Sequence, residues 1–160
     1  MRSKTIPFFV LLLGLCFIPL LAQPAQTPEQ RELAQYIRDN YDKREVMVPM
    51  RDGVKLFTAI YTPKNRTDKF PILLNRTPYS VAPYGKDKDG RDQYRATLGP
   101  NPLFAREGYI FVYQDVRGRW MSEGEFVNAR PDIANTTAQQ IDESTDTYDT
   151  IEWLLQYVQN

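Results

Sequence analysis

ILLNRTPYS, residues 72–80, combines a short apolar run with a proline-fixed turn. The three apolar residues predict a buried strand within residues 71–76. Pro78 has a fixed φ and pushes Thr77 out of the helical region, so Tyr79 follows a rigid bend at the end of that strand. Strand ends are where α/β enzymes place functional side chains, and a tyrosine hydroxyl is a neutral donor at pH 7. The stretch therefore predicts a hydrogen-bond donor at a strand end.

Upstream of this strand, two β-rich runs flank an Asp-Gly pair. The runs are residues 44–50 (REVMVPM) and 53–63 (GVKLFTAIYTP), and Asp52 and Gly53 lie at their junction. This pattern predicts an antiparallel hairpin, which we place at a sheet edge. Residues 28–39 carry one apolar stripe at helical spacing and predict a short helix in an N-terminal arm.

Downstream, the alternation of helix and strand patterns continues. The predicted elements are a surface connection or cap over residues 77–102, a helix over 102–108 ending at Gly108, a strand over 109–115, a loop over 116–126 and a helix over 143–159. The near-continuous apolar strand indicates a sheet covered on both faces. Together the elements predict the opening of a mixed α/β sheet, which is incomplete because the last helix lacks a following strand.

The last predicted helix has an expected cap and an expected apolar face. Ser144 or Thr145 is the expected N-cap. The expected face consists of Tyr148, Ile151, Leu154, Leu155 and Val158.

Residues 1–22 have the composition of a secretory signal peptide. A positively charged start precedes an apolar run over residues 7–21, which is too short for a comfortable membrane span. Cleavage is expected after Ala22 or after Ala25. The alternatives are an uncleaved anchor and a lipoprotein modified at Cys16, which the leucine before it disfavours. We expect a protein exported to the periplasm or medium, without stable membrane association after cleavage.

Composition excludes several classes of function. The formal net charge is zero, with 20 basic and 20 acidic residues, so no basic face for nucleic acid is indicated. Cys16 is the only cysteine and lies in the leader, which leaves no disulfide or thiolate site after cleavage. Asp87, Asp89 and Gly90 resemble part of a calcium loop but lack its other ligands. We expect neither a metal nor a cofactor.

Four stretches of the chain, taken in order, resemble a known group of enzymes: VPMRDGVKLFTAIYTP, ILLNRTPYS, GYIFVYQDVRGRWMSEGEF and DESTDTYDTIEWLLQ. Together they resemble the α-amino acid ester hydrolases and, more broadly, the cocaine esterase and X-Pro dipeptidyl-peptidase group of serine hydrolases. The resemblance implies an α/β-hydrolase fold followed by helical and jelly-roll domains. It makes residues 23–43 an N-terminal arm and residues 44–160 the first portion of the hydrolase domain, truncated before the nucleophile strand.

The catalytic serine and histidine of that group have no counterpart in this chain. The resemblance places the serine on a G-x-S-Y-x-G turn after the next strand, with the acid and the histidine further on. The serines here are Ser3, Ser80, Ser122 and Ser144, none in G-x-S-x-G, and histidine is absent. We expect the chain alone to be inactive and the full-length protein to cleave small esters or amides of α-amino acyl groups through an acyl-enzyme. The alternative is a non-catalytic secreted binding or structural module on a truncated hydrolase scaffold.

The resemblance also gives Tyr79 a role. In these hydrolases a tyrosine in an R-x-P-Y segment donates its hydroxyl to the negatively charged oxygen formed when the substrate carbonyl is attacked. Tyr79, in RTPY, matches that position. The structural alternative is a tyrosine whose ring packs under the connection that follows it.

Other polar and aromatic residues near strand ends have simpler interpretations. Arg117 could bind a substrate carboxylate, but a salt bridge that holds its loop is favoured. The acidic residues at the start of the last helix are interpreted as capping and dipole residues rather than as acid/base pairs: Asp142, Glu143, Asp146 and Asp149. Candidates for lining the acyl pocket are Tyr84, Tyr94 and Trp120.

Overall fold

The computed structural model describes residues 26–65, 69–128, 130–132, 137 and 140–158. The elements, in order, are α1 (Pro28–Asn40), β1 (Tyr41–Pro49), β2 (Lys55–Pro63), β3 (Ile72–Thr77), α2 (Pro102–Glu107), β4 (Ile110–Asp115) and α3 (Glu143–Tyr157). The expected leader and both cleavage positions lie outside these ranges. Within them, no helix has the length and apolar character needed to cross a membrane.

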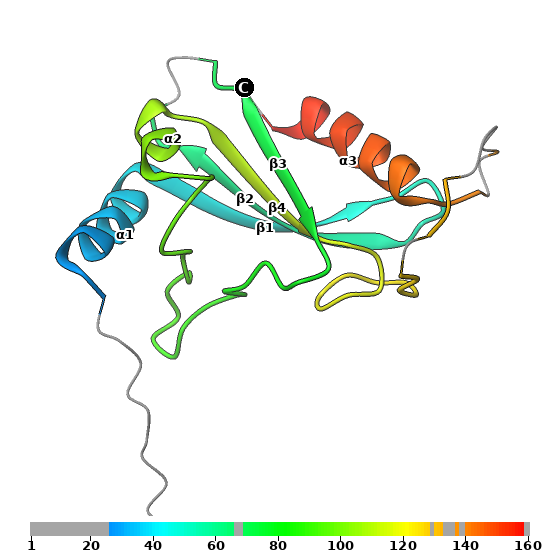
Figure 1. Ribbon diagram of the computed structural model, residues 1–160, viewed down its shortest axis with the longest axis horizontal. Coiled ribbons are helices and arrows are strands. Elements are labelled where there is room, and N and C mark those ends of the chain that lie inside the picture. The colour runs from blue at the N-terminus through cyan, green and yellow to red at the C-terminus, as the bar shows by residue number, and fades with distance from the viewer. Residues whose placement is uncertain (1–25, 66–68, 129, 133–136, 138–139, 159–160) are drawn as a thin grey trace, which may run out of the picture.

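The four strands form one mixed sheet in the order β1-β2-β4-β3 (Figure 1). β2 is antiparallel to both β1 and β4, whereas β3 and β4 are parallel. The predicted mixed α/β sheet is therefore confirmed, with the hairpin strand β1 at one edge. β3 forms the other edge of the described sheet, and none of its residues is fully buried.

The predicted antiparallel hairpin between β1 and β2 is confirmed, although its strands begin at other residues than expected. β1 begins at Tyr41 rather than at residue 44, and β2 begins at Lys55 rather than at residue 53. The connection is closed by a hydrogen bond from Met50 N–H to the Val54 carbonyl at 2.8 Å. Within it, Gly53 N–H donates to the Met50 carbonyl at 2.9 Å, so Arg51, Asp52 and Gly53 form a tight turn, with Gly53 at φ 86°.

β2 and β4 separate two cores, one on each face of the sheet. On one face, Phe57, Ala59 and Tyr61 pack with Leu33 and Ile37 of α1. On the other face, Ile60 of β2 and residues of β4 pack with Leu154 of α3 and with Val158, which follows the helix. All six residues of β4 are buried, which confirms a strand covered on both faces.

The connection between β3 and α2 covers the sheet instead of extending from its surface. Val81 and Leu98 are each about 1% exposed and belong to the core beneath α1. Figure 1 shows this segment and α3 on opposite sides of the sheet. α2 ends where predicted, at Gly108 with φ 88°, where a Cβ would lie 2.6 Å from the Phe70 ring.

Two predictions about α3 are wrong. Its N-cap is Asp142, which accepts from Thr145 N–H at 2.7 Å, while the Thr145 hydroxyl accepts from Asp142 N–H. Of the expected apolar face only Leu154 and Val158 are buried, and Tyr148, Ile151 and Leu155 are 58%, 43% and 60% exposed. The helix instead turns its polar residues Asp146 and Thr150 toward the sheet, because buried partners there bind them.

Candidate functional site

The candidate site lies where the parallel strands β3 and β4 end together. Thr77 and Asp115 are paired as the last residues of these strands. The segments that follow, residues 78–84 and 116–124, therefore leave the sheet side by side. In open α/β sheets, this carboxyl edge is where ligands bind.

Tyr79 stands out from this edge with its hydroxyl free. Its side chain is 81% exposed, and its backbone N–H donates to the Thr77 hydroxyl at 3.0 Å. Among the described residues, none forms a hydrogen bond with the Tyr79 hydroxyl. The ring is thus not packed under the connection, which was the structural alternative.

The backbone beside Tyr79 is held on both sides. The Pro78 carbonyl accepts two hydrogen bonds, from Arg119 Nε at 3.2 Å and from Trp120 Nε1 at 3.0 Å. Beyond Tyr79, Val81 N–H donates to Asp115 Oδ1 at 3.0 Å. The segment with the free hydroxyl is therefore anchored at both ends.

Asp115 is the buried centre of these contacts. It is fully buried, and its Oδ2 accepts from the Tyr84 hydroxyl at 2.9 Å and from Met121 N–H at 3.3 Å. Burial raises the pKa of Tyr84; the hydrogen bond with Ser80 opposes this effect, and the hydrogen bond to Asp115 adds to it. Tyr84 therefore remains a protonated donor that links its own loop to β4.

The aromatic residues expected to line a pocket lie in different places. Trp120 is 59% exposed beside the Tyr79 turn, and Tyr84 is bound to Asp115. Tyr94 lies elsewhere: its hydroxyl donates to the Tyr41 carbonyl and accepts from Lys43 N–H, at the start of β1. Of the three, only Trp120 presents much of its side chain beside Tyr79.

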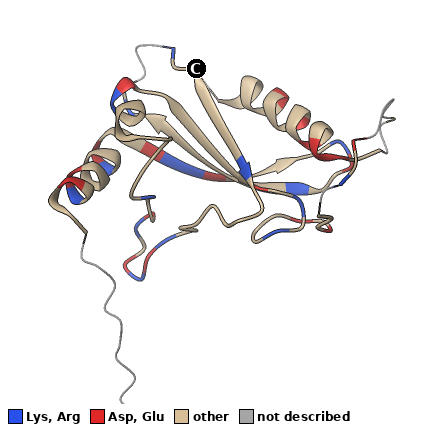
Figure 2. Cartoon of the chain, in the orientation of Figure 1, with Lys and Arg blue, Asp and Glu red and all other residues tan. Residues whose placement is uncertain are grey.

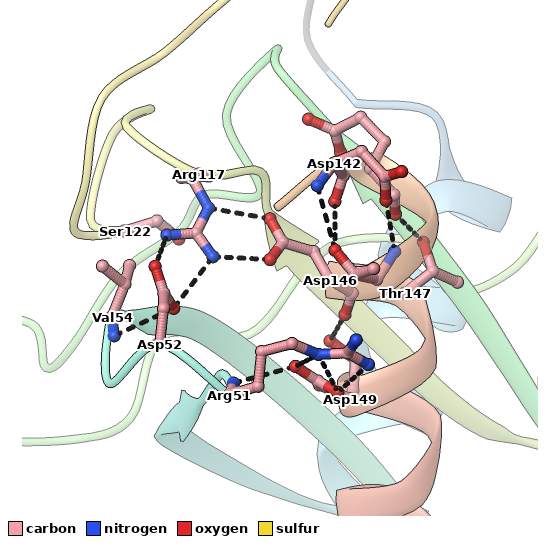
Figure 3. A network of polar contacts seen from close by, with 12 residues as sticks. Arg51, Asp52, Val54, Arg117, Ser122, Asp142, Asp146, Thr147 and Asp149 are labelled. Atoms are coloured by element: carbon pink, nitrogen blue, oxygen red, sulfur yellow. Dashed lines mark hydrogen bonds and ion pairs between the residues drawn. The ribbon is translucent and has the colours of Figure 1, made fainter. Parts of the chain in front are cut away.

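Arg117 is a structural residue, as predicted (Figure 3). It is 5% exposed, and its Nε and Nη2 bind Asp146 at 3.0 and 2.6 Å. Its Nη1 and Nη2 bind Asp52 at 2.7 and 3.2 Å. Burial lowers the pKa of Arg117, but the two carboxylates outweigh this effect and raise it. With both carboxylates bound, the guanidinium is committed to joining the loop after β4 to the hairpin and α3.

The acidic residues that gather at the start of α3 (Figure 2) do not form an acid/base pair. Asp142 caps the helix, as a capping interpretation predicts. Asp149 instead binds Arg51, from Arg51 Nη2 to Oδ1 at 2.8 Å, and Asp146 binds Arg117. Asp146 and Asp149 are therefore ion-pair partners that connect α3 to the hairpin connection, Asp149 directly and Asp146 through Arg117.

A second, partly buried arginine fixes the end of β3. Arg76 Nε donates to Gln114 Oε1 at 2.7 Å, and its Nη1 donates to the Glu143 carbonyl at 2.9 Å. Burial lowers the pKa of Arg76, an effect that Glu143 and Asp146 partly offset. The strand that leads into the Tyr79 turn is thereby tied to β4 and to α3.

The described serines that lie near the site serve the framework. Ser122 Oγ donates to the Asp115 carbonyl at 2.6 Å and accepts from Phe57 N–H at 2.9 Å. Ser80 Oγ lies 3.0 Å from the Tyr84 hydroxyl. The described part of the chain contains no group of three side chains suited to a metal ion, and Asp87 pairs with Arg91. The site as described is a donor on a fixed turn, without a nucleophile.

Residues 52–159 match the family model described as X-Pro dipeptidyl-peptidase (S15 family). The chain belongs to the S15 family. This S15 chain is 39% identical over 113 residues to the cocaine esterase of Rhodococcus sp. (strain MB1 Bresler), an alignment that covers 69% of the chain and 16% of the esterase. The similarity confirms the family that the four motifs indicated.

Two solved structures share the fold of this S15 chain. An α-amino acid ester hydrolase labelled with selenomethionine matches 91% of the chain and 22% of its own length, at 35% identity and a TM-score of 0.60. An aminopeptidase from a marine sediment archaeon (Thaumarchaeota archaeon) matches 89% of the chain and 22% of its own length, at 34% identity and a TM-score of 0.61. The S15 chain therefore spans about a fifth of these relatives and has the N-terminal part of an α/β-hydrolase fold.

The contacts of Asp115 are the part of this S15 site that sequence reasoning missed. The sequence indicates only that Asp115 is the last residue of the strand predicted over residues 109–115. A carboxylate directly after a buried apolar run is a usable signal, because a buried acid must find donors. Nothing in the pattern named Val81, Tyr84 or Met121 as those donors.

Proposed function

We propose that this chain is the N-terminal part of an exported serine hydrolase that cleaves small esters or amides of α-amino acyl groups through an acyl-enzyme. The observation that carries the proposal is the free, exposed hydroxyl of Tyr79 on a turn held at both ends. The similarity to an ester hydrolase, an esterase and an aminopeptidase supports the reaction class.

Tyr79 would stabilise the charge that develops during acylation. Attack on an ester or amide carbonyl creates negative charge on its oxygen, and a donor fixed in advance contributes about 3–4 kcal/mol to the transition state. Tyr79 would supply one donor, and the backbone N–H after the catalytic serine would supply another. The serine, acid and histidine would come from sequence beyond residue 160. The reaction needs no cofactor.

An assay of the full-length protein tests this function. The substrates are the 4-nitrophenyl ester of an α-amino acid and the same ester with its amine acetylated. We expect a burst of nitrophenol equivalent to the enzyme concentration, which is the kinetic sign of an acyl-enzyme. We also expect kcat/KM about tenfold higher for the free amine, since losing one charge-assisted contact costs about that factor. The absence of turnover with both esters would favour the non-catalytic module.

We also propose that residues 1–22 direct export. The positive start and the apolar run of residues 7–21 support this proposal. N-terminal sequencing of protein recovered from the periplasm or medium should then begin at Gln23 or Gln26. An intact Met1 on that material would contradict cleavage.

A further inference from the structure

Among the described residues, two other than glycine have left-handed backbone angles, and they lie in the two loops that meet at the candidate site. Ser80 has φ 30° and Trp120 has φ 51°. For a bulky side chain such as tryptophan this conformation is unfavourable, and it persists only where its surroundings hold it. Among the described residues, these are the only non-glycine positions with positive φ.

The backbone of Trp120 places its side chain across the neighbouring loop. Its indole N–H donates to the Pro78 carbonyl at 3.0 Å, although the indole is otherwise 59% exposed. Arg119 donates to the same oxygen at 3.2 Å. Since Pro78 directly precedes Tyr79, these contacts fix the position of the backbone on the N-terminal side of Tyr79.

Asp115 provides the matching contact after the tyrosine. Its Oδ1 accepts from Val81 N–H, while its Oδ2 binds the Tyr84 hydroxyl and Met121 N–H. No lysine or arginine forms an ion pair with Asp115 within the described ranges. The carboxylate therefore connects the loop after β3 with the loop after β4.

We propose that Trp120 and Asp115 are positioning residues that hold the backbone on either side of Tyr79 and so fix the place of its hydroxyl. Neither would touch the reacting atoms through this role. The inference rests on the proposed function for its effect on the reaction, because the position matters only if Tyr79 donates to the oxyanion. A donor displaced by about 1 Å can lose about 10²-fold in rate.

The test is a double-mutant cycle in the full-length protein. Trp120→Phe keeps a ring and removes the indole donor, and Asp115→Asn keeps the shape and removes the charge. We expect kcat to fall about tenfold for Trp120→Phe and about 10²-fold for Asp115→Asn, with KM nearly unchanged. In a Tyr79→Phe background neither substitution should lower kcat further by more than about twofold, because the group they position is already gone.

Trp153→Phe is the matched control, because Trp153 lies on α3, where it contacts Arg44. It should leave kcat unchanged. A Trp120→Phe protein with wild-type kcat, or one that loses as much activity in the Tyr79→Phe background, would overturn the positioning role of Trp120. Likewise, wild-type kcat in Asp115→Asn, or an equal loss of activity in the Tyr79→Phe background, would overturn the positioning role of Asp115.

Hydrogen exchange separates failure of this inference from failure of the proposed function. Peptides covering residues 77–84 are compared in the wild-type, Trp120→Phe and Asp115→Asn proteins. Faster exchange in both variants is expected, since each loses a contact to this segment. If Tyr79→Phe alone keeps full activity, the proposed donor role fails, and faster exchange would still support the holding of the turn. Unchanged exchange in both variants would refute the inference that Trp120 and Asp115 hold the turn.

Discussion

Replacing Tyr79 with phenylalanine in the full-length protein is expected to lower kcat by about 10²–10³-fold. The substitution keeps the ring and removes only the hydroxyl. Because the hydrogen bond to the substrate oxygen strengthens as negative charge develops, its loss falls on the chemical step, and KM should change much less. Steady-state kinetics with an α-amino acyl ester measure both constants.

The structure also predicts that Tyr79 contributes little to stability. Its side chain is 81% exposed, so Tyr79→Phe and Tyr79→Ala should both leave the melting temperature close to that of the wild type. Lost activity without lost stability would separate a role in chemistry from a role in packing. Near-wild-type kcat in Tyr79→Phe would rule out the donor role.

Among the substitutions proposed for this protein, removal of the Asp146 carboxylate should lower the free energy of unfolding most. Asp146 is 2% exposed and binds Arg117, which is 5% exposed. Asp146→Ala leaves a buried guanidinium with one of its two carboxylates, and removing one partner of a buried ion pair costs about 3–5 kcal/mol. The shift of the urea midpoint for unfolding of the full-length protein measures this loss.

Glu32→Ala is a suitable control for the buried pair. Glu32 pairs with Arg106 at 3.2 Å, but both side chains are well exposed, so water already screens the interaction. We expect no measurable change in the urea midpoint. If Asp146→Ala behaves like Glu32→Ala, the buried network does not stabilise the fold as we argue.

β3 and β4 are predictable from sequence because their apolar runs are short and clearly bounded. The run over residues 109–115 indicated a strand buried on both faces, and β4 is such a strand. The face of α3 was not predictable in the same way. Its orientation is decided by Asp146 and Thr150, whose buried partners Arg117 and Gln114 lie far away in the chain.

The site was predictable only in part, for a similar reason. Pro78 after an apolar strand is a local signal, and it located Tyr79 at the strand end. The contacts that hold the turn join Pro78 to Trp120 and Val81 to Asp115, which are distant in sequence. No periodicity or spacing records such pairs. The salt-bridge role of Arg117 was predicted, but its partner Asp52 was not.

The strand order has a consequence for how the chain folds as it leaves the ribosome. β1 and β2 are neighbours in sequence and in the sheet, so their hairpin can form as soon as both are synthesised. β3 is made next, yet its described neighbour is β4, and Ile72 pairs with Ile110. β3 therefore cannot form its described pairing until β4 has been synthesised. During synthesis this strand is a transiently unpaired edge of the kind that favours aggregation.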